Sequence, residues 1–323
     1  MKSAIQMGAG NIGRGFIGML LSQSDYKVTF ADVQEEMVKE LETRGEYTVE
    51  VVGDNKESIK VRNVKALLSG DPKLINVMAD ADVVTTAVGP PILKFIAPTI
   101  AKAIKMAVSQ NRSKPLNIIA CENAVRATTQ LKKLVLTELG DDLPDWVGFV
   151  DAAVDRIVPP MEPGDDISKV RVEEFYEWLV EKSALKGKAL DVKGMTLVDN
   201  LEAGVERKLF TLNTGHAVCA WLGQYLGYPT IKDAISSEKV AKLVKGIMQQ
   251  SGAALIAKHG FTEEAHAKYI EKILKRFANP YIVDSVERVG RQPVRKLSAG
   301  ERIASPVSEA MKHGLPVDKL LLG

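Results

Sequence analysis

The chain has 323 residues, a length that is long for one domain and comfortable for two. With 46% hydrophobic and 26% charged residues, it is neither a disordered tail, nor collagen-like, nor a disulfide-stapled miniprotein. Its 43 basic and 41 acidic residues leave a formal charge of +2 without a dense basic stripe, so we expect no nucleic-acid partner. The only cysteines, Cys121 and Cys219, form no paired framework, which predicts a reducing compartment and a cytoplasmic protein.

One stretch without formal charge, Leu209–Ile231, is long enough to span a bilayer. It contains Asn213, His216 and Pro229, and polar groups are costly in hydrocarbon. The glycine turn at Gly8 also comes too early for the apolar region of a signal peptide. We therefore expect this stretch to be a buried helix of a globular domain, and we expect no membrane partner.

The first half of the chain alternates short apolar runs with amphipathic stretches, which predicts an α/β fold with a doubly wound parallel sheet. The expected strands are Ala4–Met7, Lys27–Ala31, Val83–Ala87, Asn117–Ala120 and Val147–Val150, with a small hairpin formed by Tyr47–Val52 and Ser58–Val61. The expected helices are Asn11–Ser22, Val33–Arg44, Ile92–Gln110 and Ala127–Leu139.

The second half is helical in pattern almost throughout, and no strand rhythm returns. The expected helices are Leu201–Leu226, Ile231–Ile256 and Thr262–Phe277, with shorter pieces near Pro293 and Ser305. We therefore predict an α/β domain over residues 1–195 and an all-helical domain over residues 196–323.

The turn after the first expected strand reads Gly8-Ala9-Gly10-Asn11-Ile12-Gly13, a complete GxGxxG between a strand and a helix. In this motif the first glycine allows a tight turn, the second lets the backbone approach a pyrophosphate, and the third lets the helix pack on the strand. Amides at the helix start then face the phosphates, and Arg14 either adds positive charge there or lies in solvent. The motif predicts a Rossmann-type dinucleotide-binding domain; the alternative is a glycine turn without a nucleotide.

An acidic residue at the end of the second expected strand, Asp32, favours NAD over NADP. Its carboxylate accepts hydrogen bonds from the ribose hydroxyls and repels a 2′-phosphate, and the next four residues include no lysine or arginine. Ligands of open α/β sheets lie beyond the carboxyl ends of the strands. Val88 and Gly89, just after the expected strand Val83–Ala87, are therefore candidates for the nicotinamide side, although an ordinary strand end reads the same way.

Three polar side chains interrupt the apolar pattern of the expected helix Leu201–Leu226, namely Lys208, Asn213 and His216. At about 100° per residue, all three fit within roughly half of a helix circumference. Burial among apolar neighbours lowers the pKa of a lysine amine, so Lys208 is a candidate base near neutral pH. Asn213 and His216 are candidate donors to an oxygen that gains negative charge during hydride transfer. The alternative is a helix whose polar side chains are satisfied internally.

The pattern Lys-x4-Asn-x2-His resembles the signature of the polyol-specific long-chain dehydrogenases. Within that family, the surrounding segment Glu206–Ala217 resembles the mannitol-1-phosphate 5-dehydrogenases. The resemblance continues through the chain, in the segments Gly8–Gly18, Cys121–Thr128, Val154–Pro159 and Arg276–Pro280. Members usually continue for a few dozen further helical residues, so we expect the helical domain to be shortened at its C-terminal end.

The resemblance implies an NAD-dependent, metal-independent oxidoreductase that interconverts mannitol 1-phosphate and fructose 6-phosphate. Lys208 would then be the general base for oxidation and the acid for reduction. Asn213 and Asn123 would donate to the reacting oxygen, and His216 would position the substrate. The four histidines form no ligand cluster with the cysteines, in keeping with a site that needs no metal.

The family's substrate-contacting arginine and lysine map onto Arg288 and Lys296. With Arg291 and Arg295 they make a basic segment in a nearly neutral chain, as recognition of a phosphorylated substrate requires. The alternative for this segment is a solvated basic loop. Two rival functions remain: a related dehydrogenase acting on an unphosphorylated polyol or sugar acid, and a nucleotide-sensing protein without turnover. We expect a monomer that binds a small sugar phosphate.

Overall fold

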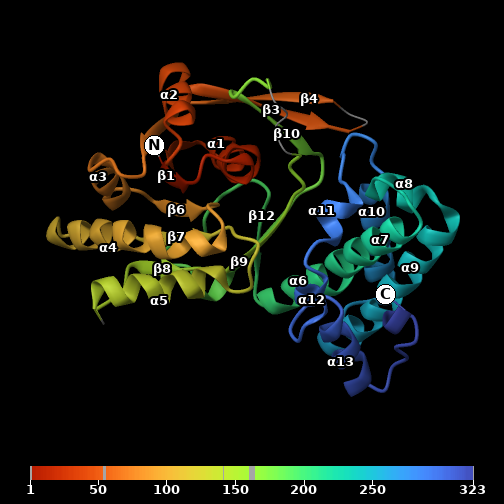
Figure 1. The fold of residues 1–323 in the computed structure, drawn as a ribbon. Coiled ribbons are helices and arrows are strands. Elements are labelled where there is room, and N and C mark those ends of the chain that lie inside the picture. Colours follow the sequence, from red (N-terminus) through yellow and green to blue (C-terminus); the bar gives the residue numbers. More distant parts are fainter. Residues whose placement is uncertain (1, 54–55, 141, 160–163, 323) are drawn as a thin grey trace. The chain divides into compact units, whose positions relative to one another are not determined.

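The structure is a computed structural model, and it describes residues 2–53, 56–140, 142–159 and 164–322 (Figure 1). The chain divides into two compact units, Met1–Leu201 and Glu202–Gly323, each of which is described by itself. The boundary expected between residues 195 and 196 falls inside strand β12 (Met195–Val198). Because β12 pairs with β11 (Glu177–Glu181), it belongs to the first unit.

A six-stranded parallel sheet forms the centre of the first unit, which confirms the α/β class. Its strand order is β5-β2-β1-β6-β7-β8, so the order reverses between β1 and β6, where open α/β sheets bind their ligands. The strands are β1 (Lys2–Met7), β2 (Tyr26–Asp32), β5 (Val64–Leu68), β6 (Val83–Thr86), β7 (Leu116–Ala120) and β8 (Val147–Phe149). Strand β5 was not predicted from the sequence.

Both faces of this sheet are buried, as parallel strands require. Ala4 and Val28 pack on the face that carries the π-helix η1 (Gly13–Gly18), α1 (Met19–Ser22) and α2 (Glu35–Arg44). Ile5 and Ile118 pack on the opposite face, which Figure 1 shows lined by α4 and α5. The helices of that face are α3 (Lys73–Ala79), α4 (Leu93–Ser109), preceded by the short η2 (Pro90–Ile92), and α5 (Ala127–Leu139).

Two small sheets complete the first unit. The predicted hairpin is present as β3 (Glu46–Val52) and β4 (Glu57–Arg62), and β10 (Lys169–Glu173) pairs with it in parallel. The other sheet has the order β12-β11-β9, where β9 spans Ala152–Asp155, and the short η3 (Lys182–Ala184) follows β11. None of β9 to β12 was predicted.

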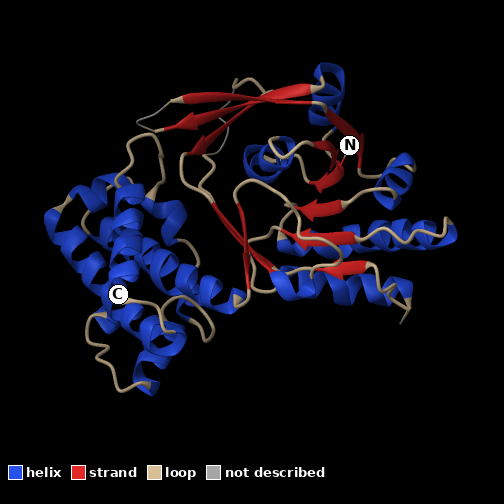
Figure 2. Ribbon diagram, turned by 180° about the vertical axis from the view of Figure 1, so that it is seen from behind, coloured by secondary structure: helices blue, strands red, loops and turns tan. Residues whose placement is uncertain are grey.

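The second unit is built from helices, as Figure 2 shows, and its described residues add only one isolated bridge, Thr230 to Ser285. The long helix expected over Leu201–Leu226 is continuous but changes pitch at Lys208 and again at Thr214. Its parts are α6 (Leu201–Arg207), the π-helix η4 (Lys208–Asn213) and α7 (Thr214–Tyr225). The remaining helices are α8 (Ile231–Ser236), α9 (Glu238–His259), α10 (Glu263–Phe277), α11 (Val286–Gly290), α12 (Pro293–Leu297), α13 (Ala304–Lys312) and η5 (Leu320–Leu322).

Buried side chains of α7, α9 and α10, among them Val218, Val244 and Ile270, form one core in the second unit. Thr230 and Thr262 begin α8 and α10, where their hydroxyls accept hydrogen bonds from the backbone N–H groups of Asp233 and Ala265. Among the residues that the structure describes, no helix combines the length and apolarity needed to cross a bilayer.

Candidate active site

The glycine turn between β1 and η1 has the geometry that its motif predicts. Gly8 has φ of +93°, and a Cβ there would lie 2.5 Å from the carbonyl oxygen of Ala87. A Cβ on Gly13 would lie 1.9 Å from the carbonyl oxygen of Gly8, so the start of the helix touches the turn itself. A Cβ on Gly10 would meet no atom within 4 Å. The first and third glycines are therefore required by the fold, whereas the second faces open space.

Asp32 ties the end of β2 to this turn. Its Oδ2 accepts a hydrogen bond from the Ala9 N–H at 2.6 Å, and its Oδ1 accepts one from the Gln34 N–H at 3.0 Å. Each oxygen keeps a second acceptor position for a hydroxyl group. The carboxylate predicted to bind the ribose therefore also shapes the glycine turn.

The structure overturns the solvated alternative for Arg14, which is 1% exposed. Its Nε donates to the carbonyl of Ala9 at 2.7 Å and its Nη1 to the carbonyl of Ile167 at 2.6 Å. Burial lowers the pKa of its guanidinium, against the raising effect of Tyr47 and Asp32. Arg14 thus fastens the glycine turn to the segment that leads into β10.

The turn after β6, which contains Val88 and Gly89, is held by a carboxylate that the sequence reasoning missed. Glu122 is 6% exposed, and its Oε1 accepts from the Thr86 hydroxyl at 2.7 Å and from the Val88 N–H at 2.9 Å. Its Oε2 accepts from the Gly89 N–H at 2.9 Å. The signal available in the sequence was an acidic residue directly after the apolar run of β7. Asn123, the next residue, lies on the surface of the first unit.

In the second unit, the candidate catalytic residues Lys208 and Asn213 are the two ends of the π-helix η4. A π-helix closes its hydrogen bonds between residues i and i+5, and such segments are frequent at functional sites. Lys208 and Asn213 have that spacing, so they lie one turn apart. The α-helical angles assumed from the sequence are therefore wrong here. In the π-helix the angle about the helix axis between Lys208 and Asn213 is smaller than in an α-helix.

Hydroxyl groups hold η4 in this form. The Ser251 hydroxyl on α9 donates to the carbonyl of Phe210 at 2.7 Å, and the Thr214 hydroxyl lies 3.1 Å from the carbonyl of Leu209. Thr211 Oγ1 lies 3.4 Å from Nε2 of the buried His266, whose pKa is lowered to about 4, mainly by burial. Phe210, Thr211 and Leu212 are buried, as expected for this segment, whereas Lys208 is only half-buried, so the burial expected around the lysine is partial.

His216 and Arg288, which the sequence placed in separate groups, share one buried carboxylate. His216 Nε2 lies 3.1 Å from Asp284 Oδ2, and the imidazole stacks on Phe277 with ring centroids 5.0 Å apart. Arg288 Nη2 donates to Asp284 Oδ1. Burial raises the pKa of Asp284, but the hydrogen bond and charge of His216 and the charge of Arg288 outweigh it and hold that pKa below its usual value. Nothing in the sequence pattern marked Asp284.

The basic segment is built around Lys296, which is only 5% exposed, so the solvated-loop alternative is wrong for this residue. Its Nζ donates to the carbonyl of Val289. Burial, followed by the charges of Arg302, Arg295 and Arg291, lowers the pKa of Lys296 to about 8. Arg302, which was not predicted from the sequence, is also near Lys296. Its carbonyl oxygen accepts a hydrogen bond from the Thr214 hydroxyl at 2.5 Å. This contact joins the basic segment to the end of η4.

One carboxylate bridges two of these arginines. Glu301 Oε1 lies 2.5 Å from Arg295 Nη1, and Glu301 Oε2 lies 3.3 Å from Arg302 Nε. Arg291 is exposed. The cluster of Arg291, Arg295, Lys296 and Arg302, hereafter the basic cluster, thus has four cationic groups and one acidic partner.

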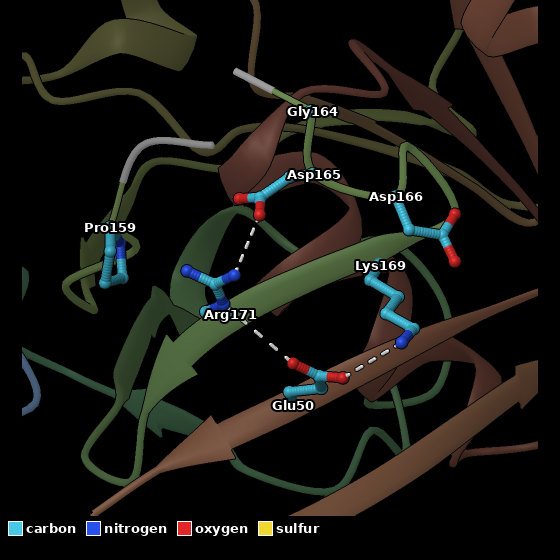
Figure 3. Close-up of a pocket in the computed structure, with 7 residues that line it drawn as sticks. All are labelled: Glu50, Pro159, Gly164, Asp165, Asp166, Lys169 and Arg171. Carbon is cyan, nitrogen blue, oxygen red and sulfur yellow. Dashed lines mark hydrogen bonds and ion pairs between the residues drawn. The ribbon is translucent and has the colours of Figure 1, made fainter. Parts of the chain in front are cut away.

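A separate cavity in the first unit contains none of the predicted site residues. Figure 3 shows Arg171 of β10 between Asp165 and Glu50, at 2.9 Å and 3.9 Å, with Lys169 3.6 Å from Glu50. Pro159, Gly164 and Asp166 complete the lining. Its two cations, Lys169 and Arg171, both pair with carboxylates of the lining, so we assign no ligand to this cavity. Among the residues that the structure describes, no three His, Cys, Asp or Glu side chains gather as a metal-binding group.

Comparison with protein families gives two matches that together cover nearly the whole chain. The mannitol dehydrogenase Rossmann domain matches residues 2–194, and the mannitol dehydrogenase C-terminal domain matches residues 200–323.

Solved structures with the same fold include polyol dehydrogenases. A D-sorbitol dehydrogenase in substrate-free form has a TM-score of 0.83 at 16% identity, covering 98% of this chain and 78% of its own. The Pseudomonas fluorescens mannitol 2-dehydrogenase, in a ternary complex with NAD and D-mannitol, has a TM-score of 0.75 at 18% identity, with coverages of 99% and 77%. A 2-dehydropantoate 2-reductase from Geobacter metallireducens is more distant, with a TM-score of 0.59 at 14% identity and coverages of 99% and 97%. At these identities the likeness establishes the fold.

Proposed function

The chain belongs to the mannitol dehydrogenase family, and from this premise we propose that it is an NAD-dependent oxidoreductase interconverting D-mannitol 1-phosphate and D-fructose 6-phosphate. The observation that carries the choice of a phosphorylated substrate is the basic cluster, in which the charges of Arg291, Arg295 and Arg302 act on Lys296 while Glu301 pairs with Arg295 and Arg302. Four like charges held together repel one another, and a bound dianion relieves that repulsion.

The glycine turn fits NAD. Gly10 leaves the turn open on the side where a Cβ would otherwise stand, and Gly13 lets the helix start reach the turn. Asp32 keeps one acceptor position on each oxygen for the ribose hydroxyls, and its negative charge disfavours the 2′-phosphate of NADP. When bound, NAD accepts the hydride of the alcohol carbon, and NADH returns it in the reverse direction.

The remaining chemistry belongs to side chains of this chain. In oxidation, the neutral amine of Lys208 takes the hydroxyl proton as the C–O bond becomes a carbonyl; in reduction, its ammonium form gives the proton back. Asn213 donates its amide hydrogen to the same oxygen, where negative charge develops. The π-helical spacing of these two residues supports that division of roles. Asn123, which the resemblance adds as a further donor, belongs to the first unit.

Arginine forks and ammonium groups bind phosphate through charge-assisted hydrogen bonds. Binding energy from a phosphate remote from the reacting carbon can also orient the carbonyl, so it contributes to kcat as well as to KM. Arg302 contacts Thr214, the residue that follows η4. This contact favours a single substrate that binds both the basic cluster and the residues of η4.

A second candidate is the oxidation of an unphosphorylated polyol, because two solved structures of this fold are named for sorbitol and mannitol. The two are separated by following NADH consumption with fructose 6-phosphate and free fructose in parallel. The proposal predicts a kcat/KM for fructose 6-phosphate at least about 100-fold higher, equivalent to about 2.7 kcal/mol of phosphate binding energy. A higher kcat/KM for free fructose selects the second candidate. Nucleotide binding without turnover of either sugar, or of the matching polyols, identifies a sensor.

A further inference from the structure

Asp284 is fixed more firmly than a surface acid at the start of a short helix. It is 4% exposed, and its carbonyl oxygen accepts from the Ile231 N–H at 2.9 Å. The next residue, Ser285, forms the isolated bridge to Thr230, and its hydroxyl accepts from the Arg288 N–H at 3.2 Å. The carboxylate therefore stands at a defined place, between the ring of His216 and the guanidinium of Arg288.

The hydrogen positions follow from the chemistry of the partners. An ionised carboxylate only accepts hydrogen bonds, and Asp284 is ionised at neutral pH because its pKa lies below the usual value. His216 Nε2, at 3.1 Å from Oδ2, must therefore carry a hydrogen.

We propose that Asp284 is a positioning residue that holds the His216 ring through its Nε2–H group and orients Arg288 with the same carboxylate, so that both side chains are placed for one polyol or sugar substrate. The inference rests on the proposed function for the substrate class, but the hydrogen bond from Nε2–H is a property of the protein alone. Because Asp284 occupies Nε2, only Nδ1 of the imidazole remains for a substrate.

One carboxylate serving two substrate-binding groups gives the substitution Asp284→Asn a distinctive effect. An amide has one acceptor oxygen and two N–H donors, so it satisfies either His216 or Arg288 but faces the other with a donor. Losing the orientation of both groups weakens ground-state binding and transition-state binding alike, so KM rises more than kcat falls. Glu287→Gln is the control for loss of a negative charge alone, because Glu287 is an exposed acid in α11, the helix that begins just after Asp284.

The first measurement is nitrogen-15 NMR of histidine-labelled protein without substrate, at about pH 8 where an ordinary imidazole is neutral. With four histidines in the chain, the variant His216→Gln assigns the signal. The proposal predicts a hydrogen on Nε2 of His216 in wild type and in Glu287→Gln, and a mixture of Nε2–H and Nδ1–H forms in Asp284→Asn. An Nδ1–H tautomer in the wild type overturns the proposal, even if Asp284→Asn does not fold.

The second measurement is steady-state kinetics with whichever phosphorylated or free substrate the protein turns over. Asp284→Asn should raise KM about 10-fold or more with a smaller fall in kcat, whereas Glu287→Gln should leave both unchanged. Equal effects of the two substitutions, or an unchanged KM in Asp284→Asn, would show that Asp284 does not position the substrate site. If fructose 6-phosphate is not a substrate, the proposed function fails, and the tautomer and the KM for the true polyol still decide the role of Asp284.

Discussion

Asp32 has two functions at one position, because its carboxylate both anchors the Ala9 N–H and is proposed to bind the ribose. Asp32→Ala should therefore raise the Kd for NADH about 10- to 100-fold, since hydrogen bonds to charged groups contribute about 1.5–3 kcal/mol. It should also narrow the preference for NADH over NADPH, because the repulsion of the 2′-phosphate is lost. NADH fluorescence titration measures both. Glu35→Ala, which removes an exposed acid from the first turn of α2, is the control; a Kd unchanged by Asp32→Ala would place the ribose elsewhere.

Lys208 is the residue that we propose as the general acid–base of the chemical step. Lys208→Ala should lower kcat about 10²- to 10⁴-fold, the usual contribution of general acid–base catalysis, while the Kd for NADH stays the same. Lys242→Ala, at an exposed lysine of α9, should change neither quantity. Full activity of Lys208→Ala would assign the proton transfer to another group.

The lowered pKa of Lys296 predicts a pH dependence for the proposed phosphate site. Because its pKa falls from 10.5 to about 8 on folding, the unfolded chain holds this proton more tightly than the folded protein does. Its contribution to the free energy of unfolding is therefore least favourable below about pH 8, and it improves as the pH rises toward 10.5. The affinity for a phosphate should instead fall as the pH rises above about 8, because phosphate binding needs the charged amine of Lys296.

We accordingly expect the KM for fructose 6-phosphate to rise above about pH 8 in the wild type. Lys296→Met, which keeps most of the buried volume and removes the charge, should have a higher KM at neutral pH and lack this rise. KM measured from about pH 7 to about pH 9 tests both expectations, with free fructose as the reference substrate. Parallel KM profiles for the two proteins would exclude Lys296 from the phosphate site.

At the scale of elements, two glycines of the turn should differ in their effects: Gly13 on protein stability and Gly10 on nucleotide binding. Gly13→Ala places a Cβ 1.9 Å from the Gly8 carbonyl oxygen, so it should destabilise the protein by about 1–3 kcal/mol or more and lower Tm. Gly10→Ala meets no protein atom within 4 Å, so Tm should hold while the Kd for NADH rises, because the pyrophosphate needs that space. Thermal unfolding and NADH titration of both variants provide the test. A Gly10→Ala protein that binds NADH normally would show that the phosphates do not approach this turn.

The sequence allowed the prediction of elements whose signals are local. The strand–turn–helix at Gly8–Gly13 has its own glycine code, and the apolar runs of β1, β2, β6 and β7 are typical of strands buried on both faces. The strands β9 to β12 have four or five residues each, and β10 pairs with a hairpin far away along the chain. Such pairings depend on tertiary contacts and leave no periodic signal of their own.

The π-helix η4 was unpredictable for a related reason. Its form depends on hydroxyl groups from elsewhere, such as Ser251 on α9, and the order of residues from Lys208 to Asn213 does not reveal it. Asp284 and Arg302 were missed because each acts through a partner distant in sequence, His216 and Thr214 respectively. The sequence thus predicted candidate reactive groups, whereas the residues that contact them became visible only in the structure.

At the scale of the whole molecule, the proposed function assigns a different role to each unit. The glycine turn and Asp32, proposed for the nucleotide, belong to the first unit, and Lys208, Asn213 and the basic cluster, proposed for the substrate, belong to the second. The likeness of the whole chain to solved polyol dehydrogenases establishes the common fold, which by itself does not determine the substrate.

The central claim is hydride transfer to the ketone carbon of a phosphorylated sugar. It is tested most directly by incubating the protein with fructose 6-phosphate and NADH carrying deuterium at C4 of the nicotinamide, and examining the product by NMR. We predict mannitol 1-phosphate with one deuterium on the carbon that was the ketone, formed much faster than deuterated mannitol from free fructose. Deuterium that stays in the nicotinamide, or that enters only the unphosphorylated sugar, would contradict the account.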